Sequence, residues 1–220
     1  MYMIIVGAGS IGLSLIQIAT KEKNNVVVVE SNVEKARDIS NKFDITVLNG
    51  NATLAETLRE AGSERADALI ATTSDDAVNL MVVSIAEQLK IPSIVSIVNE
   101  KAHAEFFNRL GANVMENPEE VVANHLYTAV KRPKVKDFTI LSQGDQVFRI
   151  ALKTDSTLVG KSFAECMDRD IIPDSMTVIA LERQGEREIV TPKTIFAPDD
   201  LLTLFSLERA SDEIIDKLTG

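Results

Sequence analysis

The chain has 220 residues, of which 45% are hydrophobic, and it carries a net charge of −10 with a pI of about 4.8. This acidity argues against a general nucleic-acid binder, because phosphate contacts need a basic surface. The apolar runs fall far short of the roughly 20 residues of a membrane-spanning helix, and the single cysteine excludes an internal disulfide and is typical of a reducing compartment.

Short apolar runs alternate with longer segments of helical spacing through residues 1–130. Four consecutive valines at 26–29 are typical of a strand that is covered on both faces. The expected strands are 2–6, 26–29, 45–48, 67–72, 93–98 and 113–115. The expected helices are 10–22, 32–41, 53–62, 76–89, 100–110 and 118–130. This alternation predicts a Rossmann-like, doubly wound α/β domain with a parallel sheet.

Capping residues mark the starts of several of these helices. Asn32 is an expected N-cap for the second helix. Thr53 and Glu56 match a capping box, in which each side chain serves the other's backbone N–H, and Gly62 is the expected end of that helix. Asn117 followed by Pro118 predicts the start of the helix that runs to about residue 130.

The alternating pattern ends at Arg132-Pro133. Beyond it we expect strands at 138–142, 147–152, 176–182, 187–191 and 201–207, and helices at 161–168 and from Ser211 onward. Gly144-Asp145 is a hairpin signal between the first two strands. The chain therefore divides into an α/β domain at 1–132 and a small α+β domain at 138–220. The basic stretch 131–136 between them is interpreted as a solvated linker rather than a contact for an anionic surface.

Gly7, Gly9 and Gly12 form a Gly-x-Gly-x-x-Gly turn between the first strand and the first helix. In such a turn the first glycine permits a tight bend, the second lets the backbone approach a pyrophosphate, and the third lets the helix pack closely on the strand. The helix start then offers free amides and a partial positive charge to the phosphates. The alternative is a packing turn without a ligand.

Glu30 ends the second strand, 18 residues after Gly12. A carboxylate at this position binds the ribose hydroxyls of an adenosine and repels a 2′-phosphate. The pattern therefore favours NAD(H) or another adenine nucleotide over NADP. The alternative interpretation of Glu30 is a surface glutamate.

Two polar stretches, 50–53 and 72–76, follow the third and fourth strands, at the edge of the sheet where ligands bind. Their hydroxyls and amides are candidates for the adenine and phosphate sites, or are helix caps, and the two roles are compatible. The predicted nucleotide-binding residues are Gly7, Ala8, Gly9, Ser10, Ile11, Gly12, Glu30, Ser31, Asn51, Ala52, Thr72, Thr73, Ser74 and Asn99.

These motifs, in this order and spacing, resemble an RCK (KTN) domain. The resemblance rests on the glycine turn, Glu30, the stretch 50–53, a Thr73-x-x-Asp76-x-x-Asn79 pattern and Leu110-Gly111-Ala112. It continues past the linker in three stretches that look like the family's C-terminal ligand domain. These stretches are 158–162, 178–180 and 189–205.

The resemblance implies a cytosolic regulatory subunit of a Trk- or Ktr-type potassium uptake system. Such a subunit binds NAD(H), or ADP, ATP or AMP, and forms dimers that build a tetrameric or octameric gating ring. Its partner is a membrane potassium-translocating subunit, which places it at the inner face of the cell membrane. The chain departs from the family at Asn51, where an acid or histidine is frequent, and at 96–99, where a basic residue is frequent. Fewer cations near the phosphates favour NAD(H) over ATP.

The sequence presents no catalytic or metal-binding set. His103 and His125 have no partner at metal-ligand spacing, Cys166 has no companion thiol, and Asp75-Asp76 is explained by the start of a helix. The expected protein is therefore a sensor and not an enzyme. The alternatives are an NAD-dependent oxidoreductase with a small C-terminal substrate domain, and a redox-sensing repressor, against which the acidic charge counts.

The helix 76–89 is apolar nearly all round, so more than one of its sides is expected to be covered. Either a neighbouring helix or a second subunit supplies that cover. The resemblance favours a homo-oligomer through this helix. It also suggests dimer contacts in the helices between 100 and 130, with the candidates Phe106, Phe107, Val121, Val122 and Leu126.

Overall fold

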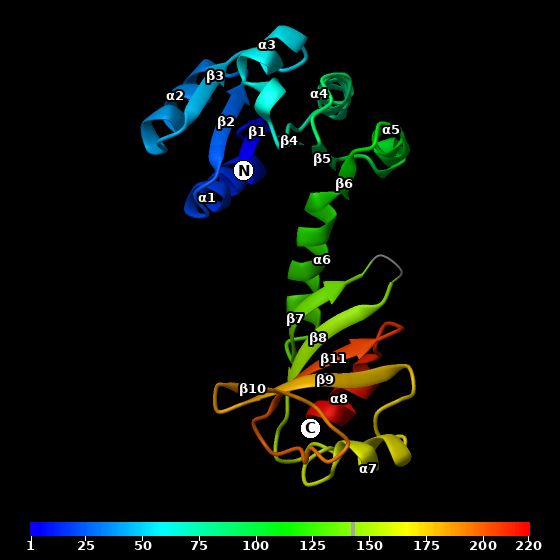
Figure 1. The fold of residues 1–220 in the computed structure, drawn as a ribbon. Coiled ribbons are helices and arrows are strands. Elements are labelled where there is room, and N and C mark those ends of the chain that lie inside the picture. Colours follow the sequence, from blue (N-terminus) through cyan, green and yellow to red (C-terminus); the bar gives the residue numbers. More distant parts are fainter. Residues whose placement is uncertain (142–143) are drawn as a thin grey trace. The chain divides into compact units, whose positions relative to one another are not determined.

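The computed structural model describes residues 1–141 and 144–220 (Figure 1). The chain forms two compact units, residues 1–121 and residues 122–220. Residues 142–143, which include the end of the predicted strand 138–142, lie outside the described residues. No helix within the described ranges is long and apolar enough to cross a membrane.

The first unit is built on a six-stranded sheet in the order β3-β2-β1-β4-β5-β6, with every neighbouring pair parallel. The strands are β1 (Tyr2–Val6), β2 (Asn25–Glu30), β3 (Thr46–Asn49), β4 (Ala68–Ala71), β5 (Ser93–Val98) and β6 (Asn113–Glu116). The strand order reverses between β1 and β4. Ligands of open α/β sheets bind at such a reversal, beyond the carboxyl ends of the strands.

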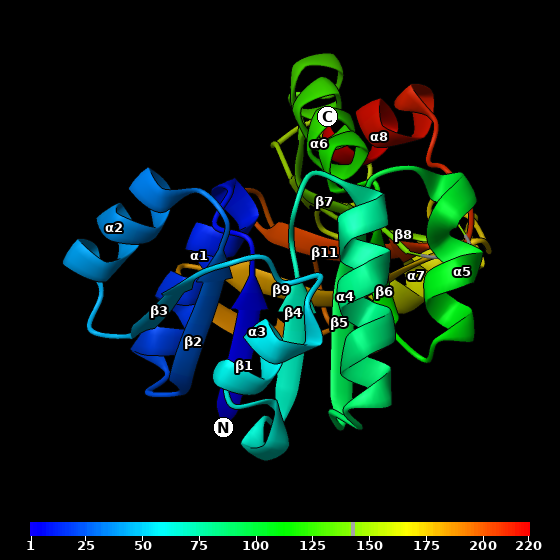
Figure 2. The same cartoon turned by 90° about the horizontal axis from the view of Figure 1, so that it is seen from above.

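Helices cover both faces of this sheet, as Figure 2 shows for α3 and α4 on the near face. The covering helices are α1 (Ser10–Lys21), α2 (Val33–Lys42), α3 (Ala55–Glu60), α4 (Asp76–Gln88) and α5 (Ala104–Arg109), with short 3₁₀ turns η1 (Ser63–Arg65) and η2 (Lys101–His103). The helix α6 (Pro118–Lys131) begins in the first unit and continues into the second. The predicted Rossmann-like, doubly wound α/β fold is confirmed.

The valine run divides its side chains between two cores. Val27 and Val29 join the core under α3, α4 and α5. Val26 and Val28 join the core under α1 and α2. Successive side chains of a strand point to opposite faces, so an unbroken apolar run is what a strand buried on both faces requires.

Two predicted caps are confirmed, at Asn32 and Asn117, and the predicted capping box is wrong. The Asn117 side chain accepts a hydrogen bond from the backbone N–H of Glu120 at 3.2 Å, directly before α6. The Asn32 side chain accepts a hydrogen bond from the backbone N–H of Lys35 at 3.0 Å, as an N-cap does. The predicted Thr53–Glu56 capping box does not form, because α3 begins at Ala55 and its N-cap Leu54 has no side-chain bond. Thr53 instead donates from both its N–H and its hydroxyl to the side-chain oxygen of Asn51, a local turn that competes with the helix.

The chain itself covers part of the apolar surface of α4, while Met81 remains 51% exposed. Val82, Val83, Ile85 and Ala86 are buried within the chain, in a core that also holds Phe107 of α5. A neighbouring helix therefore supplies part of the cover that the sequence left open. Phe107, one of the proposed dimer contacts, is likewise fully buried in its own subunit.

The second unit holds an antiparallel sheet in the order β10-β9-β11-β8-β7, so the predicted small α+β domain is confirmed in its class. The strands are β7 (Val135–Ile140), β8 (Gln146–Ala151), β9 (Met176–Arg183), β10 (Glu186–Ile189) and β11 (Leu201–Ser206). The helices α7 (Phe163–Asp168) and α8 (Asp212–Thr219) complete it.

The basic stretch 131–136 is more than a solvated linker. Arg132 is only 8% exposed and its guanidinium lies 2.6 Å from the carboxylate of Asp212. Lys134 pairs with Asp216 at 2.8 Å. Both partners lie on α8, so this stretch fastens the start of the second unit to its last helix. The sequence of this basic stretch is typical of a linker, because its ion pairs are made with a distant segment and leave no signal in the local sequence.

Asp76 joins the start of α4 to the end of β5. One carboxylate oxygen accepts from the backbone and side-chain N–H groups of Asn99, both at 2.8 Å. The other accepts from the Glu100 N–H at 2.9 Å and lies 2.8 Å from Nδ1 of His103, which accounts for His103 structurally. Burial alone would raise the pKa of Asp76, but the backbone hydrogen bonds from Asn99 and Glu100 and the His103 contact outweigh it and lower that pKa.

The contact between Gly12 and the turn before α1 predicts a strong effect of one methyl group. A Cβ at Gly12 would collide with the carbonyl oxygen of Gly7 and lie 3.0 Å from the Thr72 hydroxyl, so Gly12→Ala must push α1 away from the sheet. We expect a loss of about 1–3 kcal/mol in the free energy of unfolding, measured by urea denaturation. Gly9→Ala is the control, because a Cβ there meets no atom within 4 Å. Equal stability of the two variants would contradict this packing role.

The contacts of Asp76 predict a pH-dependent stability. Because the folded-state pKa is lowered, the ionised carboxylate stabilises the protein above its unfolded pKa of about 3.9, and this contribution is lost as the pH falls through the folded value. We expect Asp76→Asn to lose about 1–3 kcal/mol near neutral pH. The deficit should shrink below about pH 4, as urea denaturation over that range measures.

Asp75→Asn is the matched control for this experiment. Asp75 caps α4 by accepting from the N–H groups of Ala77 and Val78, and Asn caps as well as Asp does. It should change stability little at any pH. A deficit for Asp76→Asn that persists unchanged into acid would show that shape, and not the carboxylate charge, is responsible.

Candidate nucleotide site

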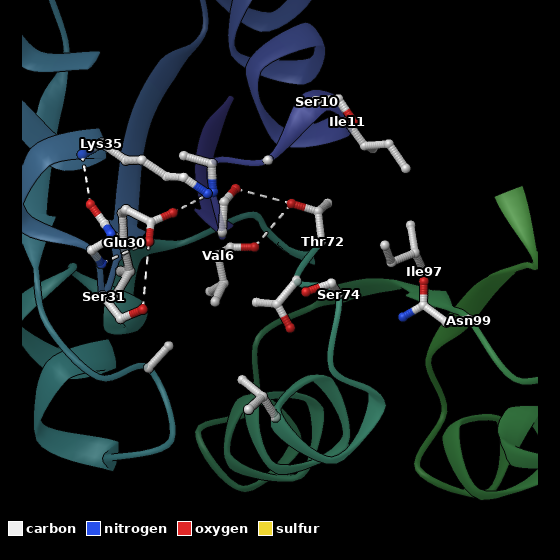
Figure 3. Close-up of a pocket in the computed structure, with 18 of the residues that line it drawn as sticks. Val6, Ser10, Ile11, Glu30, Ser31, Lys35, Thr72, Ser74, Ile97 and Asn99 are labelled. Atoms are coloured by element: carbon white, nitrogen blue, oxygen red, sulfur yellow. Dashed lines mark hydrogen bonds between the residues drawn. The ribbon is translucent and has the colours of Figure 1, made fainter. Parts of the chain in front are cut away.

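A pocket of about 420 Å³ opens at the carboxyl ends of the central strands of the first unit (Figure 3). Its walls come from the turn after β1, the end of β2 with the start of α2, the turns after β3 and β4, the end of β5 and the first residues of α6. The strand order reverses at this point of the sheet. The position is the one that the sequence predicts for a ligand of a doubly wound domain.

All but one of the predicted site residues line this pocket. The lining set includes Gly7, Ala8, Gly9, Ser10, Ile11, Glu30, Ser31, Asn51, Ala52, Thr72, Thr73, Ser74 and Asn99. Gly12 lies outside the lining, against Gly7 and Thr72, where it lets α1 approach the turn. The pocket wall also contains residues that sequence reasoning missed. These are Val6, Val29, Asn32, Lys35, Val78, Ile97, Pro118 and Glu119, while Gly50 belongs to the predicted stretch 50–53.

The glycine turn has the geometry of an anion cradle. Gly7 has φ +91°, a left-handed conformation that L side chains rarely adopt, and a Cβ on it would lie 3.0 Å from the Thr73 methyl group. Gly9 faces open space, so a ligand can approach its backbone. The helix α1 starts at Ser10 without a side-chain cap, which leaves its first amides free to bind an anion.

Glu30 is 7% exposed and holds the glycine turn in place. One carboxylate oxygen accepts from the backbone N–H of Ala8 at 2.7 Å, and the other accepts from the N–H of Asn32 at 2.8 Å. The carboxylate thus ties β1 to the start of α2. Its two oxygens have about four lone-pair positions, so it retains acceptor capacity toward the pocket.

Lys35 is the one Lys or Arg among the described residues that line the pocket. It lies in the first turn of α2, and Figure 3 shows its side chain on the same side of the pocket as Glu30. No ion pair joins Lys35 to another described residue. The sequence could have placed Lys35 in the site, because the N-cap at Asn32 puts Lys35 in the first turn of the helix that follows Glu30.

Thr72 and Thr73 shape the pocket wall through bonds to the scaffold. The Thr72 hydroxyl is 3.0 Å from the carbonyl oxygens of both Val6 and Gly7 and donates to them (Figure 3). The Thr73 hydroxyl donates to the side-chain oxygen of Asn79 at 2.7 Å, and the Asn79 amide donates back to the Thr73 carbonyl oxygen. Asn79 is fully buried. Within the Thr-x-x-Asp-x-x-Asn pattern, Thr73 and Asn79 therefore hold the turn after β4 in place through these hydrogen bonds.

The described residues offer no metal site and no reactive cysteine. They contain no group of three His, Cys, Asp or Glu side chains placed to hold a metal ion. Cys166 is fully buried in the core of the second unit, and that burial raises the pKa of its thiol. The thiol is the inert form of cysteine.

Comparisons with known proteins point to one family. The TrkA-N domain model matches residues 3–118. The "Trk system potassium uptake protein TrkA homolog" of Methanothermobacter thermautotrophicus is 28% identical over 222 residues, and the match covers all of both chains. The "Trk system potassium uptake protein TrkA" of Azorhizobium caulinodans is 33% identical over 212 residues, 93% of this chain but 45% of that protein. The chain thus spans about half of this bacterial relative.

A solved structure described as "GsuK channel bound to NAD" matches the whole chain, and the match covers 39% of that protein, with a TM-score of 0.64 and 21% identity. At this identity the likeness concerns the fold. The family model, in contrast, covers more than half of the sequence and includes the glycine turn, Glu30 and the ends of all strands that line the pocket. The chain belongs to the TrkA-N domain family.

Proposed function

We propose that the protein is a nucleotide-sensing regulatory subunit of a membrane potassium uptake system. The observation that carries the proposal is the pocket formed by the glycine turn and Glu30 in a chain of the TrkA-N family. Relatives that match over most of this chain are named Trk system potassium uptake proteins. Because these relatives are named as uptake proteins and not as enzymes, we assign the pocket a sensing role.

An adenine nucleotide is the proposed ligand, with NAD(H) first and ADP, ATP or AMP as alternatives. The free amides at the start of α1 bind the pyrophosphate, and Gly9 permits its close approach. Glu30 accepts hydrogen bonds from the adenosine ribose, beside Lys35. Asn51, Ala52 and the turn 72–74 form the remaining walls.

We propose that residues 1–132 carry this nucleotide site and that residues 138–220 form a regulatory domain. The helix α6 leads from one to the other. Pro118 and Glu119, its first residues, line the pocket. A ligand therefore contacts the end of the helix that continues into the second unit. A ligand changes the state of the protein only to the extent that it binds one arrangement of these parts more tightly than another.

Exposed apolar residues on α6 make it the proposed contact between subunits. None of its residues is buried, and Val122, Leu126 and Val130 repeat at a spacing of four, with Leu126 62% and Val130 84% exposed. Phe106 of α5 is half exposed. Burying each such side chain in a partner contributes roughly 1.5–3 kcal/mol, so a few of them hold a dimer together. Such dimers, assembled into a tetrameric or octameric ring on the cytoplasmic side of the membrane, would act on a separate potassium-translocating subunit.

Glu30 predicts the choice between NADH and NADPH. A 2′-phosphate would lie against the buried carboxylate, whereas a 2′-hydroxyl donates to it, so NADH should bind at least about tenfold more tightly than NADPH. Isothermal calorimetry on the purified protein measures both affinities. Glu30→Gln should reduce the difference by improving NADPH binding. Comparable affinities of the wild-type protein for NADH and NADPH would contradict the assigned role of Glu30.

Leu126→Glu should separate subunit assembly from ligand binding. The buried charge opposes contact between α6 helices, while the pocket lies elsewhere on the chain, so the variant should lose mass in light scattering and keep its nucleotide affinity. In cells that lack the native gene, the variant should leave rubidium uptake at the level of the gene deletion. The wild-type gene should restore it.

Asn124→Glu is the control for charge on the same helix. Asn124 is exposed on the side of α6 opposite Leu126, and the substitution adds the same carboxylate. It should assemble and restore uptake as the wild type does. A wild-type protein that is monomeric at concentrations of about tens of micromolar, or an assembled Leu126→Glu variant, would refute the proposed contact.

A further inference from the structure

The two ends of the pocket differ in charge and in hydrogen-bonding character. Glu30 and Lys35 lie at one end and Asn99 lies at the opposite end (Figure 3). The free amides of α1 lie at the glycine turn, toward which an anion is drawn. The end near Asn99 is formed with Ile97, Pro118 and Glu119, and none of these four side chains carries a positive charge.

Asp76 fixes the orientation of the Asn99 amide. The carboxylate oxygen of Asp76 accepts from both the backbone N–H and the side-chain NH₂ of Asn99, each at 2.8 Å. A flipped amide would place its oxygen against a carboxylate oxygen, and an ionised carboxylate only accepts. The lowered pKa of Asp76 keeps that carboxylate ionised. The side-chain oxygen of Asn99 is thereby left for other donors.

The Asn99 side-chain oxygen accepts no hydrogen bond from the described residues, and it is not among their buried unpaired atoms. It is therefore an accessible acceptor on the pocket wall. Glu119, exposed at the start of α6, adds a second acceptor to the same end. The carboxylate of Glu119 repels phosphate oxygens, no cation among the described residues offsets it at this end of the pocket, and both acceptors bind hydroxyl or amide N–H groups.

We propose that Asn99, positioned by Asp76, makes this end of the pocket selective for an uncharged group that carries hydrogen-bond donors, and excludes a terminal phosphate. The ligand class is then a dinucleotide whose second half presents ribose hydroxyls and an amide, as NAD(H) does. A nucleoside triphosphate would place its third phosphate against Asn99 and Glu119. This inference rests on the proposed nucleotide function and specifies the ligand of the same site.

ADP, NADH and ATP provide a direct test, because ADP is the part that the other two share. Calorimetry on the full chain should give NADH as the tightest ligand and ATP as at least about tenfold weaker than NADH, in EDTA and again with MgCl₂. If none of the three binds, the nucleotide function itself is wrong. If ADP binds and ATP equals or exceeds NADH under either condition, the selectivity inference alone is overturned.

Asn99→Lys should reverse the preference. A cation at this wall attracts the third phosphate and removes the acceptor, so ATP should gain about tenfold and NADH should lose affinity. Asn108→Lys is the matched control, because it adds the same charge at an exposed position of α5 outside the pocket. It should leave the NADH-to-ATP ratio unchanged. An unchanged ratio in Asn99→Lys would overturn the assignment.

Asp76→Asn tests the positioning role. It removes one acceptor oxygen from the contact that orients the Asn99 amide, so the NADH-to-ATP affinity ratio should fall toward one. A role confined to folding would weaken NADH and ATP equally and leave the ratio where it was. That result would remove Asp76 from the proposal and leave Asn99 to be judged by its own variant.

Discussion

The site depends on how closely α1 approaches the turn that follows β1. Gly12 packs against the carbonyl group of Gly7, with the Thr72 hydroxyl beside it, and even a single methyl group would not fit there. This approach puts the first amides of α1 at the carboxyl end of the central strand. Glu30 then fixes the turn from the other side through the Ala8 N–H. The surface that we propose to bind the phosphates is therefore formed by the chain alone, and binding does not have to order it.

Much of the first unit was predictable because its signals are local. The four valines of β2 require cover on two faces, and the glycine pattern requires a tight turn before a helix, whatever lies elsewhere in the chain. The same reasoning brought together nearly all the predicted site residues, since the carboxyl ends of parallel strands meet at one edge. Gly12 was placed in the site for the right physical reason, close packing, but it does not line the pocket.

The failures share one cause, which is that the decisive partner lies far away in sequence or competes locally. Thr53 satisfies a capping pattern, yet Asn51 takes both of its donors and α3 starts later. Arg132 lies in a stretch that the sequence indicates to be a linker, but in the structure it pairs with Asp212 of the last helix. For α4 the sequence left a neighbouring helix and a second subunit open as the cover, and the chain's own core buries Val82, Val83 and Ala86 while Met81 stays exposed. Hydrophobic periodicity predicts that a helix has a buried face, but it does not predict which element or subunit covers that face.

The polar residues around the pocket divide into those that hold the scaffold and those that remain free to bind. Thr72, Thr73, Asn79 and Asp76 use their hydrogen bonds on the turns after β4 and β5. Such satisfied groups make the pocket walls rigid, because breaking one of these bonds leaves a buried polar atom unpaired. The free groups are then few and fixed in direction. The proposed selectivity against a terminal phosphate follows from this fixed orientation. An Asn99 amide that could turn over would offer its oxygen to a hydroxyl or its NH₂ to a phosphate.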